Sequence, residues 1–168
     1  KIIVTGCIAQ AYPEKFEGVT LLGTHNIDDI VNIVEEIMNN NTLVHLTQQS
    51  EPKLLTKTHR WNKAIGIIPI CRGCLGNCAY CIVKKTRGKL YSYPIEDIVK
   101  KSKQLIKEGV KELWLTAQDT GCYGKDINSS LPELLKELIN LQGDFKIRIG
   151  MMNPNFALEF KEGIVRLL

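Results

Sequence analysis

The chain has 168 residues, of which 44% are hydrophobic and 24% are charged, and its formal net charge is +4. This composition is typical of a globular chain that can bury a core, and the mild positive charge permits a nucleic-acid partner without requiring one. Four of the six cysteines lie within residues 71–81, and the sequence contains neither a signal peptide nor a transmembrane run. A disulfide scaffold is therefore excluded, and we expect a reducing, cytoplasmic setting without a membrane partner.

The first 46 residues predict the C-terminal part of an α/β domain. Residues 2–5 are a β-branched run, which predicts a buried strand that delivers Cys7 to a loop. Asn26 is a predicted N-cap, and acidic residues follow it where the helix dipole favours negative charge. The helix ends near residue 39, and its predicted apolar face consists of Ile27, Ile30, Val31, Val34, Ile37 and Met38. Residues 47–62 are polar and without periodicity, which predicts a linker.

Residues 63–168 alternate between strand and helix patterns. We expect strands at 64–70, 112–116 and 145–150, a helix from Pro94 to Gly109, and a helix capped by Ser130 and Glu133 as a capping box. A loop at 151–156 precedes a third helix. This βαβαβα order predicts a parallel sheet. Because a loop follows each strand at its carboxyl end, the loops near Cys74, Asp119 and Asn153 are expected to share one rim of that sheet.

Cys74, Cys78 and Cys81 form a C-x3-C-x2-C run after the first of these strands. Cysteine thiolates hold iron–sulfur clusters, usually four thiolates for one [4Fe–4S] cluster, so three ligands would leave one iron open for chemistry. A structural zinc site is the alternative, because Cys71 and Cys74 can pair with Cys78 and Cys81. Zinc ribbons separate such pairs by roughly 15–20 residues, whereas only a short spacer separates them here. The cysteine spacing leaves both interpretations open.

A basic cluster follows the cysteines directly and contains Lys84, Lys85 and Arg87. It is either a solvated loop or a set of RNA phosphate contacts.

Several segments together carry a resemblance to a known family. The chain resembles the radical S-adenosylmethionine (AdoMet) methylthiotransferases, and most of all the archaeal and eukaryotic branch that acts on threonylcarbamoyladenosine in tRNA. The segments that carry the resemblance are 6–10, 73–81, 87–88, 92–94, 115–124 and 148–154.

The resemblance implies a fold of class α/β. The tail of an N-terminal α/β domain (1–46) would be followed, after the linker, by the first half of a partial (β/α) radical-AdoMet barrel (63–168). Later barrel strands and an RNA-binding domain would come after Leu168, so we expect the chain to be a middle portion of a longer enzyme. Cys7 would ligate an auxiliary cluster whose other two cysteines precede Lys1.

The implied function is methylthiolation of threonylcarbamoyladenosine next to the anticodon. The implied partners are tRNA, AdoMet and an electron donor, and the implied cofactors are AdoMet and two [4Fe–4S] clusters in the whole enzyme. Cys74, Cys78 and Cys81 would hold the AdoMet-binding cluster. The residues implied around AdoMet are Tyr80, Thr116, Gln118, Asp119, Arg148 and Asn153.

Each of these assignments has a structural alternative. Tyr80 could pack the core, Asp119 could cap a turn, and Arg148 could pair with an acid. Cys71 is interpreted as a small buried residue rather than a fourth ligand, and Cys122 receives no role. The competing function is a structural zinc- or cluster-binding RNA-interaction module without catalysis.

Overall fold

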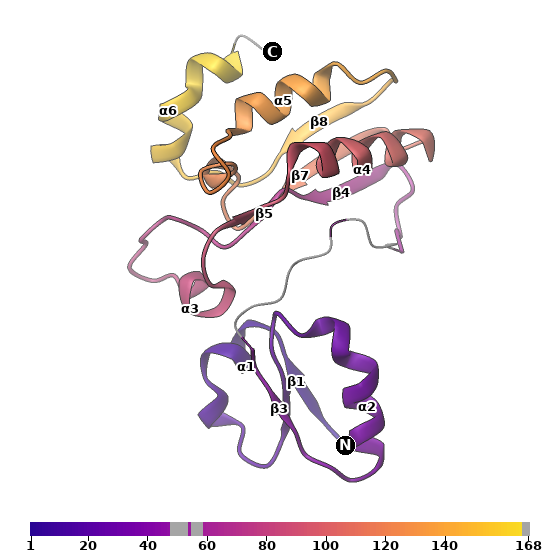
Figure 1. The fold of residues 1–168 in the computed structure, drawn as a ribbon, viewed down its shortest axis with the longest axis vertical. Coiled ribbons are helices and arrows are strands. Elements are labelled where there is room, and N and C mark those ends of the chain that lie inside the picture. Colours follow the sequence, from indigo (N-terminus) through magenta and orange to yellow (C-terminus); the bar gives the residue numbers. More distant parts are fainter. Residues whose placement is uncertain (48–53, 55–58, 166–168) are drawn as a thin grey trace. The chain divides into compact units, whose positions relative to one another are not determined.

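The structure is a computed structural model that describes residues 1–47, 54 and 59–165 (Figure 1). It contains two compact units, each described by itself below. The first comprises the described residues of Lys1–Pro52 together with Asn77–Gly88, and the second comprises those of Lys53–Gly76 and Lys89–Leu168. The predicted linker at 47–62 lies largely outside the described residues. Residues 77–88, which the sequence patterns placed with the second block, belong to the first unit.

The first unit contains a three-stranded parallel sheet in the order β1-β2-β3. Its strands are β1 (Ile3–Thr5), β2 (Thr20–Leu22) and β3 (Val44–His45). The expectation that the first strand is buried was wrong, because β1 is only partly buried whereas all three residues of β2 are buried. The reason is position in the sheet: β2 has a hydrogen-bonded neighbour on each side, and β1 has one among the described strands.

A short 3₁₀ turn (η2, Ile27–Asp29) leads into helix α2 (Ile30–Met38). Ile33 and Ile37 of this helix are buried with Leu22 of the sheet. Much of the predicted apolar face is instead exposed; these residues are Ile27, Val31, Val34 and Met38. The prediction failed because α2 has two apolar stripes, and the sheet covers only one of them.

Asn26 is not a side-chain cap for this helix. Its amide nitrogen donates to Thr47 Oγ1 at 2.6 Å, and its Oδ1 accepts the Thr47 N–H at 3.0 Å. Asn26 therefore ties the loop after β2 to the chain beyond β3.

Two short helices, α1 (Cys7–Ala11) and α3 (Val83–Arg87), pack against each other in the first unit. Cys7 is the first residue of α1, so the predicted loop at this position is a helix start. The loop after β2 also contacts α3, because the Thr24 hydroxyl donates to the Thr86 carbonyl at 2.9 Å. A 3₁₀ turn, η1 (Pro13–Lys15), follows α1.

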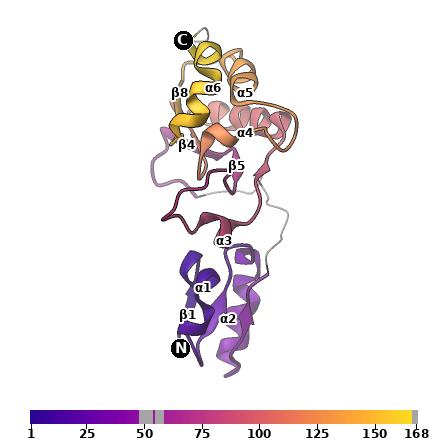
Figure 2. The same cartoon turned by 90° about the vertical axis from the view of Figure 1, so that its left-hand side faces the viewer.

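The second unit contains the predicted parallel sheet, in the order β4-β7-β8. Its elements are β4 (Ile65–Pro69), α4 (Ile95–Lys107), β7 (Glu112–Thr116), α5 (Leu131–Ile139), β8 (Lys146–Ile149) and α6 (Pro154–Val165). Helices α4 and α5 lie side by side (Figures 1 and 2). Their apolar sides bury Ile68, Leu113 and Leu115 of the sheet in one core.

One of the two hydrogen bonds of the predicted capping box at α5 forms. Ser130 Oγ accepts the Glu133 N–H at 3.4 Å, as predicted. The Glu133 carboxylate, however, accepts the hydroxyl of Ser129 at 2.8 Å. Helix α6 begins at Pro154, inside the stretch predicted as a loop, and its backbone is kinked at Phe160.

Strands β5 (Cys71–Arg72) and β6 (Tyr91–Ser92) form an antiparallel pair that the sequence did not predict. They pair Cys71 with Ser92 and Arg72 with Tyr91. The cysteine run and α3 therefore lie within an excursion whose two ends are held together in the second unit. Over the described part of the chain, no helix combines the length and the apolar character that a membrane span requires.

Candidate functional site

Loops that follow the three strands of the parallel sheet in the second unit meet at one rim of that sheet, as the strand order predicted. The Gly73 N–H, after β5, donates to Gln118 Oε1 at 2.9 Å. The Asn153 N–H, after β8, donates to Asp119 Oδ1 at 3.2 Å, and the Thr120 N–H donates to the Met151 carbonyl at 2.9 Å. Backbone hydrogen bonds thus fix the loops after β7 and β8 to each other, and Gln118 fixes the cysteine loop to them.

Asp119 is the centre of this network. It is buried and caps the 3₁₀ turn η3 (Thr120–Cys122), because its Oδ1 accepts the Gly121 N–H at 3.0 Å as well as the Asn153 N–H. The predicted alternative of a turn cap is therefore confirmed. Its other oxygen, Oδ2, lies 3.9 Å from Cys74 Sγ.

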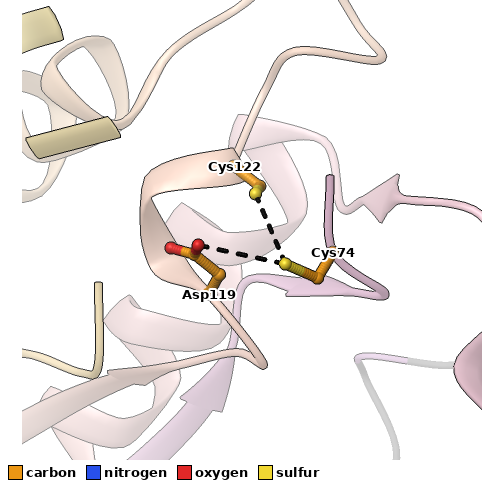
Figure 3. A group of neighbouring side chains, drawn as sticks. All are labelled: Cys74, Asp119 and Cys122. Atoms are coloured by element: carbon orange, nitrogen blue, oxygen red, sulfur yellow. Dashed lines mark hydrogen bonds between the residues drawn. The ribbon is translucent and has the colours of Figure 1, made fainter. Parts of the chain in front are cut away.

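Figure 3 shows Cys74, Asp119 and Cys122 pointing toward one another. The sulfurs of Cys74 and Cys122 are 4.0 Å apart, and one ligand atom from each of the three residues lies within 4.8 Å of the others. Backbone amides reach both sulfurs: the Gly76 N–H donates to Cys74 Sγ at 3.1 Å, and the Leu75 N–H donates to Cys122 Sγ at 3.4 Å. Sequence reasoning gave Cys122 no role. The sequence offered one indication of a role: Cys122 lies three residues after Asp119, in the loop that follows a predicted strand.

Burial raises the pKa of the Cys122 thiol to about 12, and the negative charges of Asp119 and Cys74 add to the shift, although the Leu75 N–H opposes it. The pKa of Cys71 is also raised to about 12, mainly by burial and then by Cys122. Cys71 Sγ lies 3.7 Å from the Asp119 carbonyl oxygen, to which it donates. The prediction that Cys71 is a small buried residue is confirmed, and both buried thiols are protonated near neutral pH.

Cys78 and Cys81 are exposed and belong to the first unit, whereas Cys74 is half-buried and belongs to the second. The Cys81 N–H donates to the Cys78 carbonyl at 3.1 Å, so the two cysteines occupy the ends of one turn. Tyr80, inside this turn, is 91% exposed, which contradicts the core-packing alternative. Cys7 is half-buried in the first unit.

The other predicted AdoMet residues lie on β7, on β8 or in the loops after them. Thr116 is the last residue of β7 and is half-buried. Arg148, whose Cα pairs with that of Trp114 in the sheet, stacks its guanidinium 4.2 Å from the centre of the Trp114 ring. The side chain of Asn153 accepts the Asn155 N–H at 3.1 Å at the start of α6.

The predicted RNA-contacting residues are all on α3. Lys84 Nζ donates to Asn77 Oδ1 at 3.4 Å, and Lys85 Nζ lies 4.8 Å from the centre of the Tyr12 ring. Lys15 Nζ lies 4.7 Å from the centre of the same ring. Arg87 is half-buried at the C-terminal end of α3. Two lysines of the first unit, Lys15 and Lys85, thus lie at the ring of one tyrosine.

Comparison with known proteins gives two findings. The model of the radical SAM superfamily, where SAM is S-adenosylmethionine, matches residues 68–168. The whole chain is similar to the threonylcarbamoyladenosine tRNA methylthiotransferase of Homo sapiens (39% identical) and that of Mus musculus (38%), and it covers 31% of each of those proteins. It is 40% identical to the probable threonylcarbamoyladenosine tRNA methylthiotransferase of Pyrococcus abyssi, with 98% of this chain and 40% of that protein aligned. The chain therefore spans roughly a third to two fifths of the length of these relatives.

Proposed function

This chain belongs to the radical SAM superfamily, and from that premise we propose that it forms part of an enzyme that methylthiolates threonylcarbamoyladenosine in tRNA. The observation that carries the proposal is the similarity of the whole chain to methylthiotransferases of animals and archaea, at 38–40% identity. A structural zinc module, the competing interpretation, has no comparable support.

Membership of the superfamily implies a [4Fe–4S] cluster and SAM. We assign the cluster to Cys74, Cys78 and Cys81. The donor set fits, because cysteine thiolates are the ligands of such clusters and these three cysteines lie within eight residues of sequence. The Gly76 N–H that reaches Cys74 Sγ is the kind of hydrogen bond that tunes the potential of a cluster sulfur.

When bound, the cluster and SAM supply the radical chemistry, and the protein supplies binding, orientation and exclusion of water. Gln118 is a positioning residue in this proposal, since its side chain holds the backbone of the cysteine loop at Gly73. We assign Thr116, Gln118, Asp119, Arg148 and Asn153, which lie on β7 and β8 or in the loops after them, to SAM. Asp119 would also orient Cys74. Tyr80 is exposed beside Cys81 and is assigned to the adenine of SAM.

Cys7 is assigned to a second, auxiliary cluster, with its other ligands outside this sequence. Lys84, Lys85 and Arg87 are assigned to tRNA phosphates, and an electron donor would reduce the cluster that binds SAM. These roles extend the relatives' named activity to residues of this chain.

The test is anaerobic reconstitution with iron and sulfide, followed by reduction in the presence of SAM. We expect about four irons per chain at the SAM-binding cluster and release of methionine with 5′-deoxyadenosine. Cys78→Ser and Cys81→Ser should each lose iron and cleavage, whereas Cys71→Ala should keep both. Full iron content and cleavage in Cys78→Ser would contradict the ligand assignment. Loss of metal in Cys71→Ala equal to that in Cys74→Ala would favour a four-thiolate structural site.

A further inference from the structure

We propose that Cys74, Asp119 and Cys122 form a mononuclear Zn²⁺ site that shares Cys74 with the cluster site and fills when the cluster is absent. All three residues belong to the second unit, so the site lies within one body of the structure. Two sulfur ligands and one carboxylate ligand are a donor set that zinc accepts in proteins.

The ligand-atom separations are close to those of a tetrahedral zinc ion. With Zn–S of about 2.3 Å and Zn–O of about 2.0 Å, tetrahedral geometry separates two sulfurs by about 3.8 Å and a sulfur from an oxygen by about 3.5 Å. The corresponding distances here are 4.0 Å between the sulfurs of Cys74 and Cys122, and 3.9 Å between Cys74 Sγ and Asp119 Oδ2. Movements of a few tenths of an ångström would close these two edges, and along the third edge the ligand atoms of Cys122 and Asp119 lie within 4.8 Å of each other.

Each ligand atom is already oriented by a second set of contacts. The two backbone N–H groups at Asp119 Oδ1, from Gly121 and Asn153, leave Oδ2 directed at Cys74. The amides of Gly76 and Leu75 donate to the two sulfurs. Metal ligands are characteristically held by such outer hydrogen bonds, which fix their orientation and add affinity.

The charges of the three ligands suit a dication once the metal binds. Asp119 and Cys122 are buried, and the two thiols would give up their protons on binding, so Zn²⁺ would face one carboxylate and two thiolates. Cys74 is half-buried and gives the metal an open side, where a water molecule would complete four ligands.

Zinc at this site would exclude the cluster, because Cys74 cannot serve both. This consequence, but not the zinc site itself, rests on the proposed function. Bound zinc would thus hold the chain in an inactive form until Cys74 is released. The zinc affinity that Cys122 contributes would set the fraction of the chain in that form.

The test uses the 168-residue protein, free of metal, reduced and anaerobic, and titrated with Co²⁺ as a spectroscopic substitute for Zn²⁺. We expect one equivalent to bind, with thiolate-to-cobalt charge transfer and the intense visible bands of tetrahedral Co²⁺, and Zn²⁺ should displace it. Cys122→Ser, Cys74→Ser and Asp119→Asn should each weaken binding by more than about 100-fold, since losing a ligand costs more than losing an outer hydrogen bond. The double variant Cys78→Ser/Cys81→Ser should bind like the parent.

The opposite pattern, with binding lost in Cys78→Ser/Cys81→Ser and kept in Cys122→Ser, would overturn the proposal, because it would place the metal on the cysteine run. Asp119→Asn tests the site without removing a buried thiol, and circular dichroism of each variant checks that it is folded. Alkylation of the parent protein gives a test without substitutions: Zn²⁺ should protect Cys74 while Cys78 and Cys81 remain reactive. Protection of all three would overturn the proposal.

A competition experiment then separates this inference from the proposed function. Prior loading with Zn²⁺ should lower cluster assembly in the parent protein, whereas Cys122→Ser should assemble its cluster despite the zinc. If zinc binds through Cys74, Asp119 and Cys122 but cluster assembly is unaffected, the zinc site stands and Cys74 is not a cluster ligand. If these three residues bind no zinc, the inference falls and the cluster assignment is unaffected.

Discussion

Because of two buried thiols, the stability of the folded chain depends on pH in the alkaline range. The pKa of Cys71 and that of Cys122 are raised from an ordinary value of 9.0 to about 12, with burial as the first cause in each case. Below about pH 9 both thiols are protonated in the folded and unfolded chain, so their contribution to stability is complete. As pH rises from 9 toward 12 the unfolded chain loses protons first, so this contribution is progressively lost.

We therefore expect the free energy of unfolding of the reduced, metal-free protein to fall above pH 9, by up to about 1.4 kcal/mol per pH unit for each thiol. Urea unfolding at a series of pH values measures this slope. Cys71→Ala should make the slope shallower, and Cys78→Ala, which removes an exposed thiol, is the matched control. Equal slopes in the parent and in Cys71→Ala would show that the buried thiol does not carry the effect.

Two glycines with nearly the same backbone conformation are expected to respond differently to substitution. Gly124 and Gly109 have φ of +84° and +86°. A Cβ at Gly124 would run into the Ser129 carbonyl and the Ser130 nitrogen, whereas a Cβ at Gly109 would meet nothing within 4 Å. Gly109→Ala should cost about 1–2 kcal/mol from the left-handed conformation alone. Gly124→Ala should cost more than about 4 kcal/mol because backbone must also move. Similar losses by urea unfolding would refute this distinction.

At the scale of elements, the sequence predicted those with a strong internal pattern. Strand β7 was predicted to the residue and α4 nearly so, because alternation and helical periodicity are local properties. Strands β5 and β6 have two residues each, too few for a pattern, and they exist because of their pairing with each other. The buried face of α2 was misassigned because a helix with two apolar stripes does not reveal which one a sheet will cover.

At the site, only the features that depend on strand order were predictable. Asp119 and Asn153 follow strands of one parallel sheet, so their common rim follows from strand order alone. The place of Cys122 beside Cys74 does not, because it depends on how η3 turns back toward the cysteine loop. The stacking of Arg148 on Trp114 depends on strand register, which no single segment specifies.

Helix α5 offers a test of its cap with an internal control. Ser130→Ala removes the hydroxyl that accepts the Glu133 N–H, and we expect it to lower stability by about 1 kcal/mol. Ser129→Ala removes a hydroxyl that only meets the Glu133 carboxylate, and we expect a change within about 0.5 kcal/mol. Chemical unfolding of both variants measures the difference, and a larger loss for Ser129→Ala would mean that the carboxylate contact is the true cap.

At the scale of the whole molecule, the net charge of +4 is less informative than its distribution. If α3 contacts tRNA, neutralising Lys84, Lys85 and Arg87 to Gln should flatten the slope of log affinity against log salt by about 2. The control neutralises three exposed lysines of α4, Lys100, Lys103 and Lys107, which changes the net charge equally. Filter binding with tRNA measures both slopes. The same flattening in both triple variants would indicate a general charge effect rather than a site on α3.

The chain enters the second unit, returns to the first for Asn77–Gly88, and then leaves it again. The first unit is therefore built from two separate lengths of polypeptide, held to each other by the packing of α1 on α3 and by the Thr24–Thr86 hydrogen bond. If the chain is cut between these two lengths, their packing can still hold the two pieces together, as in proteins reassembled from fragments.

A protease site placed between residues 48 and 58 tests this directly. After cleavage, the piece that ends near Thr47 should still co-elute with the remainder on size exclusion and should separate only in denaturant. Thr24→Val, which removes one hydrogen bond to α3, should make the nicked pieces separate at a lower urea concentration. Immediate separation on cleavage in buffer would mean that the peptide connection, and not the packing of α1 on α3, holds the first unit together.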